Sequence, residues 1–417
     1  MRHFDLIVIG SGPAGEKGAA QAAYFGKRVA IIEREKHVGG VVVNTGGLAS
    51  KTLRETVLYY TGIRQRGLYD HDYSLRENMN IGSFMHRKQN VVRCQWDIVS
   101  QNLLRHNIEV IHGTARLKNK NTVIVGSAPD YEEDLHADVI LIATGSSPLR
   151  PGNIPFTPNV IYDSDEILKM SRIPRSMLVL GGGAIGTEYS SIFTAMGVEV
   201  TLLEPHDRIL GFLDAEIVKR LTMRLEQLGL RFLFNDPVIN METQDGNVQI
   251  TLQSGATHTF ETALIAVGRR SNIENLGLEE VGVALGERGL VKVNEKYQTN
   301  VPNIYAAGDV IGFPALASTS MEQARVAMVH AFDLLYKETV SRTLPVAVYA
   351  IPEISAVGLT EEDCKNKKIA YEVGRAYYEN SPRGQIIGDT VGMIKLIFSP
   401  GKNACLAHIS SVSRRLS

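Results

Sequence analysis

The segment Asp5-Leu-Ile-Val-Ile-Gly-Ser-Gly-Pro-Ala-Gly15 (DLIVIGSGPAG) places a glycine-rich turn directly after a run of apolar residues. An alanine-rich stretch follows, and then Val29-Ala-Ile-Ile-Glu33, an apolar run that ends in a carboxylate. This order predicts a strand, a tight turn, a helix and a second parallel strand. Gly10 permits the turn, Gly12 lets a pyrophosphate approach the backbone, and Gly15 lets the helix pack on the strand. The segment therefore predicts a dinucleotide-binding unit with phosphates at the helix N-terminus.

A second copy of the same plan lies at Ser176-Met-Leu-Val-Leu-Gly-Gly-Gly-Ala-Ile-Gly186, followed by a strand-like run that ends at Glu204. Its three glycines in register with the first copy are Gly181, Gly183 and Gly186. In each copy the first glycine and the acid are 23 positions apart, close to the ~20 expected for a carboxylate on a ribose diol. Such glycines can also merely close a turn in an α/β protein. Two copies, each with its acid, favour one flavin and one nicotinamide nucleotide, a combination that moves hydride.

Three later segments fit the same architecture. Ala137–Gly145 and Glu261–Gly268 each join an apolar strand to small residues and a glycine, one after each fingerprint. We expect them to close the two nucleotide-binding domains. Thr299–Asp309 is a short strand that delivers an aspartate after a glycine, before a helix-like run. Ala-Gly-Asp alone is usually a turn, but a carboxylate at a strand end can also accept hydrogen bonds from a polyol such as a ribityl chain.

Bulk composition excludes several classes of function. The chain has 417 residues and a formal net charge of -1, which gives no reason to expect nucleic acid as a partner. It starts without the pattern of an export signal, and no apolar run approaches the ~18 residues of a membrane span. The three cysteines lack paired spacing for metal or redox work. We therefore expect no metal site, no membrane partner and a cytoplasmic location.

Taken in their order along the chain, the five motifs resemble the flavoprotein disulfide reductase family, which includes lipoamide dehydrogenase, glutathione reductase, mercuric reductase and the soluble pyridine nucleotide transhydrogenases. The resemblance spans almost the whole chain. It implies an α/β fold with two Rossmann-like dinucleotide-binding domains plus a partial C-terminal α+β interface domain. It implies FAD as cofactor, held by Gly10, Gly12, Gly15, Glu33, Gly39, Gly40, Lys51, Ala143, Thr144, Gly145 and Asp309. It implies NAD(P)H as substrate, held by Gly181, Gly183, Gly186, Glu188, Glu204 and Gly268.

Within that family, the stretch VGGVVVNTGGLASK (38–51) resembles the redox loop, but Val42 and Gly47 stand where the family has its two cysteines. Without a thiol pair there is no disulfide to relay electrons. The loop and the segment Arg64–Tyr69 are similar to the soluble transhydrogenase branch of the family, which dispenses with the pair. Val42 departs even from this branch, which usually keeps the first cysteine. The resemblance implies hydride transfer between NADPH and NAD⁺ by a ping-pong route through flavin N5.

The catalytic candidates are Lys51 and Glu188, taken from the family's lysine and glutamate pair beside flavin N5. Lys51 would steady negative charge on the reduced flavin, and Glu188 would hold Lys51 and the nicotinamide carboxamide. Composition alone favours the alternative of a surface lysine and a helical glutamate. Their positions within the motifs favour function.

Glu204 bears on which nucleotide is used. A carboxylate at this position suits the NAD ribose and repels a 2'-phosphate. His206 and Arg208, in the turn that follows, could accommodate the phosphate or could be solvated loop residues. The sequence therefore predicts that both nucleotides are used, with a better fit for NAD.

The motif order predicts an FAD-binding segment at 1–150, an NAD(P)-binding domain at 151–270, a second FAD-binding segment with the central region at 271–340, and a truncated interface domain at 341–417. Residues 402–417 drift from the family pattern of a second apolar strand leading to a helix. A frame-shifted or truncated gene and a natural short tail both explain this. A half-made domain would leave strand edges open, which makes the family's homodimer an open question for this chain.

Three functions remain open from sequence. The first is the NAD(P)⁺ transhydrogenase reaction. The second is an NAD(P)H diaphorase, which would pass hydride to another acceptor from the same thiol-free site. The third is a catalytically dead, truncated nucleotide-binding relative.

Overall fold

The computed structural model describes residues 1–61, 81–128, 131–341, 343–387, 390–401 and 404–412. The Arg64–Tyr69 motif lies outside these residues. The chain divides into two compact units, each of which combines helices and sheets as the sequence predicts. Unit 1 comprises Met1–Ala49, Gln89–Ser147 and Arg269–Arg342, and unit 2 comprises Ser50–Lys88, Pro148–Gly268 and Thr343–Ser417. The finer division into four functional segments stays a prediction.

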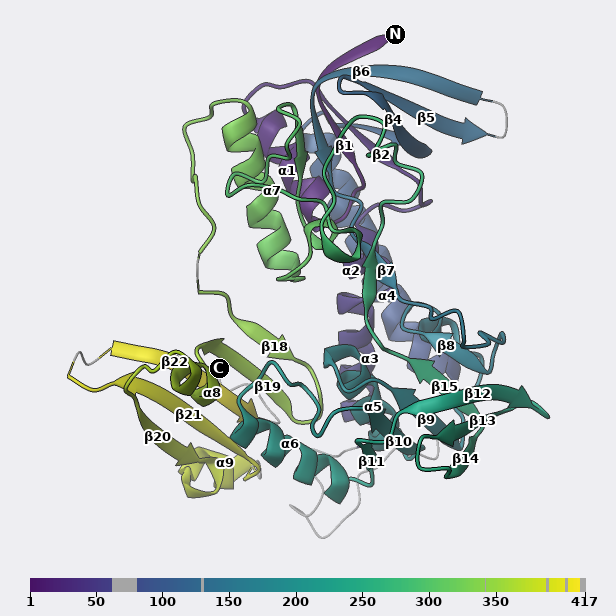
Figure 1. Ribbon diagram of the computed structural model, residues 1–417, viewed down its shortest axis with the longest axis vertical. Helices are drawn as coiled ribbons and strands as arrows, with labels where there is room; N and C mark the ends of the chain where they lie inside the picture. Colours follow the sequence, from purple (N-terminus) through teal and green to yellow (C-terminus); the bar gives the residue numbers. More distant parts are fainter. Residues whose placement is uncertain (62–80, 129–130, 342, 388–389, 402–403, 413–417) are drawn as a thin grey trace. The chain divides into compact units, whose positions relative to one another are not determined.

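Unit 1 is built on a seven-stranded sheet (Figure 1). Its parallel part has the order β3-β2-β1-β6, with β17 beside β6. Two antiparallel strands, β4 and β5, continue the sheet beyond β6 and are joined by a hairpin between Asn119 and Thr122. The bounds are β1 (Arg2–Ile9), β2 (Val29–Glu33), β3 (Glu109–His112), β4 (Thr114–Asn119), β5 (Thr122–Ala128), β6 (Tyr131–Ile142) and β17 (Ile304–Ala306).

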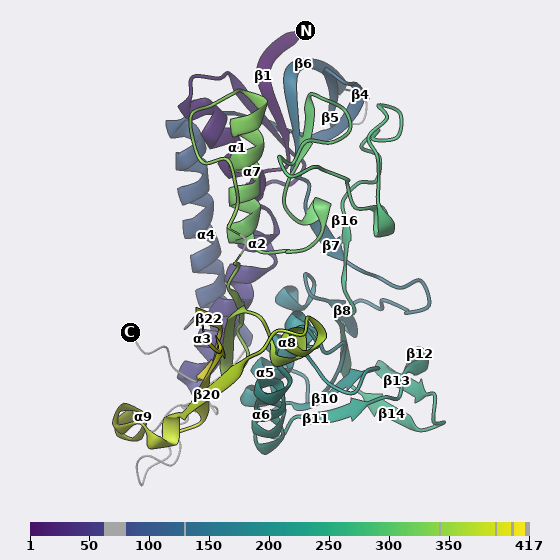
Figure 2. The same cartoon turned by 60° about the vertical axis from the view of Figure 1, so that its left-hand side comes forward.

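Helices α1 (Pro13–Tyr24) and α7 (Ala317–Ala331) lie side by side in unit 1, as Figures 1 and 2 both show. Small residues let them pack closely, because a Cβ added to Gly18 of α1 would lie 3.3 Å from Ala324 Cβ of α7. The long helix α4 (Ile81–Arg105) supplies Val99 and Leu103 to the same core. Burial of these apolar side chains is the main force that stabilises the unit. A short pair of strands, β7 (Ser146–Pro148) and β16 (Arg269–Ser271), completes it.

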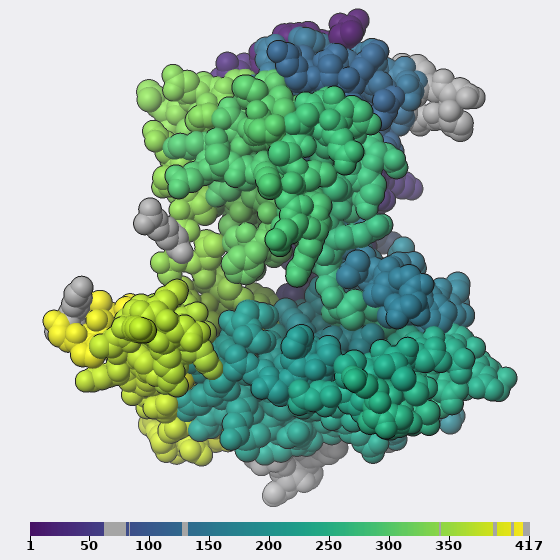
Figure 3. All heavy atoms as spheres, viewed as in Figure 1, coloured from purple at the N-terminus to yellow at the C-terminus, as the bar shows by residue number. Residues whose placement is uncertain are grey.

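Unit 2 contains a five-stranded parallel sheet in the order β11-β10-β9-β15-β8. Its strands are β8 (Ile161–Asp163), β9 (Ser176–Leu180), β10 (Glu199–Glu204), β11 (Arg231–Phe234) and β15 (Thr262–Ile265), with helices α5 (Ala184–Met196) and α6 (Ala215–Gln227). A three-stranded antiparallel sheet adds β12 (Val238–Gln244), β13 (Asn247–Leu252) and β14 (Thr257–Phe260). Its side chains form part of the surface in Figure 3.

The C-terminal part of unit 2 is a five-stranded antiparallel sheet in the order β18-β19-β22-β21-β20. Its elements are β18 (Val346–Val348), β19 (Glu353–Gly358), α8 (Glu361–Asn366), β20 (Glu372–Tyr377), α9 (Pro382–Ile387), β21 (Gly392–Ser399) and β22 (Ala404–Val412). The expectation that residues 402–417 depart from the family's second apolar strand is wrong for residues 404–412. These residues form strand β22 between β19 and β21. The reason is alternation: Ala407, Ile409 and Ser411 are buried, while His408 between them is exposed.

A buried ionic cluster ties this sheet to α6. Lys395 of β21 is 0% exposed, and its Nζ lies 2.8 Å from Asp214 Oδ1 and 2.9 Å from Glu216 Oε2. Asp214 also caps α6 by accepting a hydrogen bond from the backbone N–H of Glu216. A hydrogen bond from Arg375, aided by Lys395, lowers the pKa of Glu216 to about 2. Among the described residues, no helix combines the length and apolar character that crossing a membrane needs.

Candidate active site

The turn between β1 and α1 has the backbone that the sequence predicts. Gly10 has φ +101°, and a Cβ there would lie 2.6 Å from the Ala143 carbonyl oxygen. A Cβ on Gly15 would lie 1.8 Å from the Gly10 carbonyl oxygen, so helix and strand meet at the distance that only glycine allows. By contrast, a Cβ on Gly12 would meet only Gly40 Cα, at 3.9 Å. The open side of the turn therefore lies at Gly12, where the backbone is free for a phosphate.

Glu33, at the end of β2, is hydrogen-bonded to this turn. One carboxylate oxygen accepts from Ser11 N at 2.9 Å and from Ser11 Oγ at 2.5 Å. The other accepts from Glu35 N at 2.9 Å. An ionised carboxylate offers about four acceptor positions, so Glu33 can fix the turn and still accept from a ribose hydroxyl. The residues present therefore fit a dinucleotide.

The turn between β9 and α5 repeats this geometry in unit 2. Gly181 has φ +109°, and its Cβ would lie 2.5 Å from the Ala266 carbonyl oxygen. A Cβ on Gly186 would again lie 1.8 Å from the carbonyl oxygen of the first glycine. The N-cap residue Gly183 has no atom within 4 Å of its added Cβ. The two copies in the sequence are thus two copies in three dimensions, each with open space at its middle glycine.

Glu204 at the end of β10 takes the same part in this copy. Its carboxylate accepts from Gly182 N at 2.6 Å and from His206 N at 3.1 Å, and it contacts the His206 ring at Nδ1. Arg208 lies 3.3 Å from Glu362 Oε1 of α8 and donates to Gly211 O at 3.2 Å. Both basic residues therefore have acidic partners, His206 with the predicted ribose acid itself.

Besides the turn at Gly10 and Glu33, unit 1 contains a polar network around the predicted residue Asp309. Asp309 follows β17, and its Oδ2 accepts a hydrogen bond from Ser146 Oγ at 2.7 Å. Arg269 donates to Ser146 through Nε at 2.8 Å to Oγ and through Nη2 at 2.7 Å to the carbonyl. Nearby in the sequence, Thr144 Oγ1 is buried with no hydrogen-bond partner. A buried hydroxyl without a partner is costly, and a bound ligand at this edge would satisfy it.

The predicted glycines that end the two strand segments are also in place. Gly145 has φ +67° and Gly268 has φ +135°, and an added Cβ at either would meet nothing within 4 Å. Their left-handed backbones suit glycine rather than other residues. Both carbonyls accept backbone hydrogen bonds, from Asn272 N and Leu149 N at 3.0 Å each.

The loop without cysteines is held against the first turn. A Cβ on Gly40 would lie 2.6 Å from Gly12 Cα, so only glycines allow the two backbones to meet. Gly39 N donates to Ser11 Oγ at 3.0 Å. Asn44 of α2 (Gly40–Asn44) donates to Gly40 O at 2.9 Å and accepts from Trp96 Nε1 at 2.7 Å. Trp96 therefore helps to fix this loop through Asn44.

Positions 42 and 47, which replace the family's cysteines, face each other. A Cβ added to Gly47, at the start of α3 (Gly47–Thr61), would lie 3.2 Å from Val42 Cγ2. Side chains at these positions would therefore be in direct contact. The two positions are therefore as close as a thiol pair requires, although neither carries a thiol.

The predicted pair Lys51 and Glu188 forms an ion pair within unit 2. Lys51 Nζ of α3 lies 2.7 Å from Glu188 Oε2 of α5, and Glu188 is only 6% exposed. The other Glu188 oxygen accepts from the backbone N–H of Tyr349 at 2.8 Å. The Lys51 ammonium also lies 4.9 Å from the centre of the Tyr349 ring, a cation–π distance. One turn along α3, Arg54 Nε donates to Ala350 O at 2.9 Å. Tyr349, directly after β18, therefore contacts both Lys51 and Glu188.

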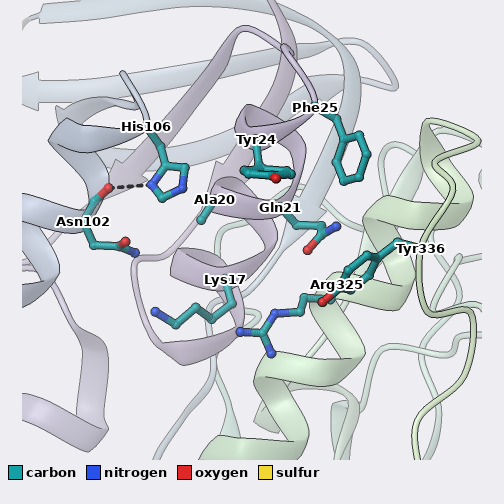
Figure 4. Close-up of a pocket in the computed structure, with 9 residues that line it drawn as sticks. All are labelled: Lys17, Ala20, Gln21, Tyr24, Phe25, Asn102, His106, Arg325 and Tyr336. Atoms are coloured by element: carbon teal, nitrogen blue, oxygen red, sulfur yellow. Dashed lines mark hydrogen bonds between the residues drawn. The ribbon is translucent and has the colours of Figure 1, made fainter.

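A surface pocket of about 380 Å³ lies elsewhere in unit 1, between α1, the end of α4 and α7 (Figure 4). None of the predicted site residues lines it. Its two cations have carboxylate partners: Lys17 pairs with Glu16 at 2.6 Å, and Arg325 pairs with Glu322. The nucleotide turns, and not this pocket, carry the predicted chemistry.

Residues 4–331 match the family model described as pyridine nucleotide-disulphide oxidoreductase. The chain belongs to this family. Residues 344–410 match the dimerisation domain of the pyridine nucleotide-disulphide oxidoreductases. The chain is therefore an oxidoreductase, and it uses FAD and NAD(P)H as members of the family do.

Curated relatives in the family carry a narrower name. A protein of Mycobacterium tuberculosis named soluble pyridine nucleotide transhydrogenase is 42% identical over 400 residues, 96% of this chain and 85% of that protein. One of Marinomonas sp. with the same name is 40% identical over 397 residues, 95% of this chain and 85% of that protein.

Two solved structures are similar over nearly the whole chain. The HOCl-induced flavoprotein disulfide reductase RclA from Escherichia coli has 28% sequence identity and a TM-score of 0.87, over 97% of this chain and 89% of that one. LpdA from Mycobacterium tuberculosis has 25% identity and a TM-score of 0.89, over 99% and 90%. These likenesses agree with the α/β fold of both units.

Sequence reasoning missed four polar residues that position the predicted ones. They are Arg54, Ser146, Arg269 and Tyr349. Ser146 directly follows the predicted Gly145, and Arg269 directly follows Gly268, so adjacency to a predicted glycine was an available signal. Tyr349 lies 161 positions from Glu188, and no local pattern links them.

Proposed function

We propose that this oxidoreductase transfers hydride between NADPH and NAD⁺, using one flavin and one nicotinamide site in alternation. The observation that carries the proposal is the loop at 39–51, which keeps its close glycine approach and the Lys51–Glu188 ion pair while valine and glycine replace the thiols. A disulfide substrate needs a thiol pair. Hydride exchange between two nicotinamide nucleotides does not. The names of the 40–42% identical relatives support the same reading.

We assign the FAD-binding role to the residues around the first turn, because the turn is open at Gly12 while Gly10 and Gly15 are closed against protein backbone, and because Glu33 is already oriented by Ser11. When bound, FAD supplies the carrier that accepts and returns the hydride. The residues assigned are Gly10, Gly12, Gly15, Glu33, Gly39, Gly40, Ala143, Thr144, Gly145 and Asp309, with Lys51 beside the reacting ring. The nicotinamide nucleotide is assigned to Gly181, Gly183, Gly186, Glu188, Glu204 and Gly268.

Lys51 and Glu188 are the proposed catalytic residues. Lys51 carries a fixed positive charge, which stabilises negative charge that develops near it during hydride transfer. Glu188 is oriented by Tyr349 N, so that one oxygen faces Lys51 and the other cannot rotate freely. Such preorganised charges need no rearrangement when the reaction occurs.

The nucleotide preference proposed is dual use with a better fit for NAD. Glu204 is directed to the turn and suits a ribose diol, whereas a 2'-phosphate needs a basic partner. Arg208 could provide one only by exchanging its contact with Glu362. Strong selectivity for NADPH over NADH in steady-state rates would contradict this part of the proposal.

Two further parts of the proposal follow the family. We propose a homodimer, supported by the match of residues 344–410 to the family's dimerisation domain. We propose a cytoplasmic location, supported by the sparse, unpaired spacing of the three cysteines. Size-exclusion chromatography with light scattering measures the first, and fractionation of the producing cells measures the second.

The decisive experiment is anaerobic spectroscopy of the purified protein with NADPH, followed by thio-NAD⁺ as acceptor. Bleaching of the flavin and then formation of thio-NADH supports the transhydrogenase. Bleaching followed by transfer only to quinones or dyes favours the diaphorase. Bound flavin that NADPH does not bleach would overturn both activities and leave a catalytically dead relative.

A further inference from the structure

Two histidines and an aspartate meet on one face of the unit 1 sheet, away from the nucleotide turns. His3 of β1 and His136 of β6 are direct partners in the parallel register, and their ring centres are 5.1 Å apart with planes at 25°. Asp138 lies two residues further along β6, on the same face as His136. His3 Nε2 lies 2.9 Å from Asp138 Oδ1. Strands β1 and β6 run together in Figure 1.

The three side chains form a donor set that suits a metal ion. One ligand atom from each lies within 4.8 Å of the others. In a tetrahedral zinc site with metal–ligand distances of about 2.0–2.2 Å, ligand atoms are separated by roughly 3.3 Å, so small side-chain rotations would suffice. His3 and Asp138 are exposed and His136 is half-buried, which leaves both room to rotate and open positions for water. Imidazole and carboxylate are ligands that Zn²⁺ takes readily.

Two cations, on strands β1 and β4, have carboxylate partners of their own. Arg2 pairs with Glu133 at 2.7 Å and also contacts Glu109, and Lys118 pairs with Asp134 at 2.6 Å. The backbone is fixed as well, because Asn303 donates to the carbonyl of Asp138 at 3.3 Å.

The described residues contain a second group of possible metal ligands, Asp214, Glu216 and Glu361, which already holds a cation. There the Lys395 ammonium lies among Asp214, Glu216 and Glu361, and it already supplies the positive charge. No lysine or arginine has a described contact of this kind with His3, His136 or Asp138.

We propose that His3, His136 and Asp138 form a binding site for a divalent first-row transition-metal ion of the Zn²⁺ type, with water in the remaining position. The site would cross-link β1 to β6 at the end of the sheet and stabilise unit 1 without taking part in hydride transfer. The sequence predicts no metal site because its cysteines lack metal spacing. These ligands come from positions 133 residues apart, which strand pairing alone brings together.

The test is isothermal titration of the FAD-loaded full chain with ZnCl₂, comparing wild type with His136→Asn and Asp138→Asn. The matched control is His408→Asn, which removes an exposed histidine from a strand in the other unit. Binding at Cys94 or Cys405, both exposed, would persist in all four proteins. We expect one equivalent of Zn²⁺ in wild type and the control that is lost or weakened about tenfold or more in the two variants, since even outer partners of a metal site contribute about 10–100-fold.

Thermal unfolding gives a second readout, because a ligand that binds only the folded state raises Tm as its concentration rises. We expect Zn²⁺ to raise Tm in wild type and in His408→Asn, and to do so less in His136→Asn. FAD content measured in parallel shows that each variant is folded. Identical zinc isotherms for wild type and His136→Asn would overturn the proposal, and would leave only the hydrogen bond between His3 and Asp138.

Discussion

Glu188→Gln removes the charge that holds Lys51 while keeping the length and shape of the side chain. The two charges are 2.7 Å apart, and their side chains are 32% and 8% exposed. At an effective dielectric constant of ~20, Coulomb's law gives a gross attraction of about 6 kcal/mol. Most of this is offset by desolvation, and hydrogen bonds to charged groups contribute about 1.5–3 kcal/mol net.

If Lys51 acts on charge that develops during hydride transfer, this loss appears in the rate. With a factor of ten for each ~1.4 kcal/mol, kcat for NADPH-to-thio-NAD⁺ transfer should fall roughly 10- to 150-fold. KM for either nucleotide should change much less, because the interaction acts in the transition state more than in binding. The assay is stopped-flow flavin reduction by NADPH under anaerobic conditions, together with steady-state transfer.

A double-mutant cycle separates this role from a general loss of stability. In the Lys51→Gln/Glu188→Gln variant, the effects of the single changes should not add, with a coupling energy of at least about 1 kcal/mol. FAD content and Tm of each variant serve as controls for folding. An unchanged rate of flavin reduction in Glu188→Gln, or single effects that add within about 0.5 kcal/mol in the double variant, would refute the assignment.

Three further predictions concern other parts of the chain. Gly12→Ala and Gly183→Ala should fold normally, since their added Cβ atoms meet no crowding protein atom. The added methyl group should overlap a bound phosphate at a cost of about 1–3 kcal/mol. Gly12→Ala should therefore weaken FAD binding, and Gly183→Ala NADPH binding, each roughly 5- to 150-fold. A Gly12→Ala protein purified with full FAD would contradict this. The double variant Val42→Cys/Gly47→Cys should form a disulfide, which thiol titration measures. NADPH should nevertheless bleach the flavin of the wild type as well as that of the double variant. Bleaching confined to the double variant would show that the loop needs thiols. Finally, a hydrogen bond from Arg375 lowers the pKa of Glu216 from 4.5 to about 2, so its stabilising contribution is present above pH 4.5 and is lost as pH falls toward 2. Glu216→Gln should therefore lower the urea midpoint most near pH 6, with a difference that shrinks below pH 4.5 and that would be constant with pH if the charge had no role.

Much of the candidate site could be predicted because its determinants are local. The turn at Gly10 and the turn at Gly181 each place three glycines and an acid within one strand-helix-strand unit, and the backbone has no other way to make these approaches. Motif order then predicts the family. Trp96 shows what local patterns leave out, because only the folded chain gives its indole N–H the partner Asn44.

The sequence by itself determined the two nucleotide turns and the loop without thiols, since each is encoded within a few dozen neighbouring residues. Lys51 and Glu188, 137 positions apart, were paired only through the resemblance to the family. Tertiary structure decided which groups hold them in place. Tyr349 reaches Glu188 across 161 positions, Lys395 reaches Asp214 across 181, and β1 meets β6 to bring His3 beside His136. These contacts depend on how strands and helices pack, and packing is a property of the whole chain that no local pattern records.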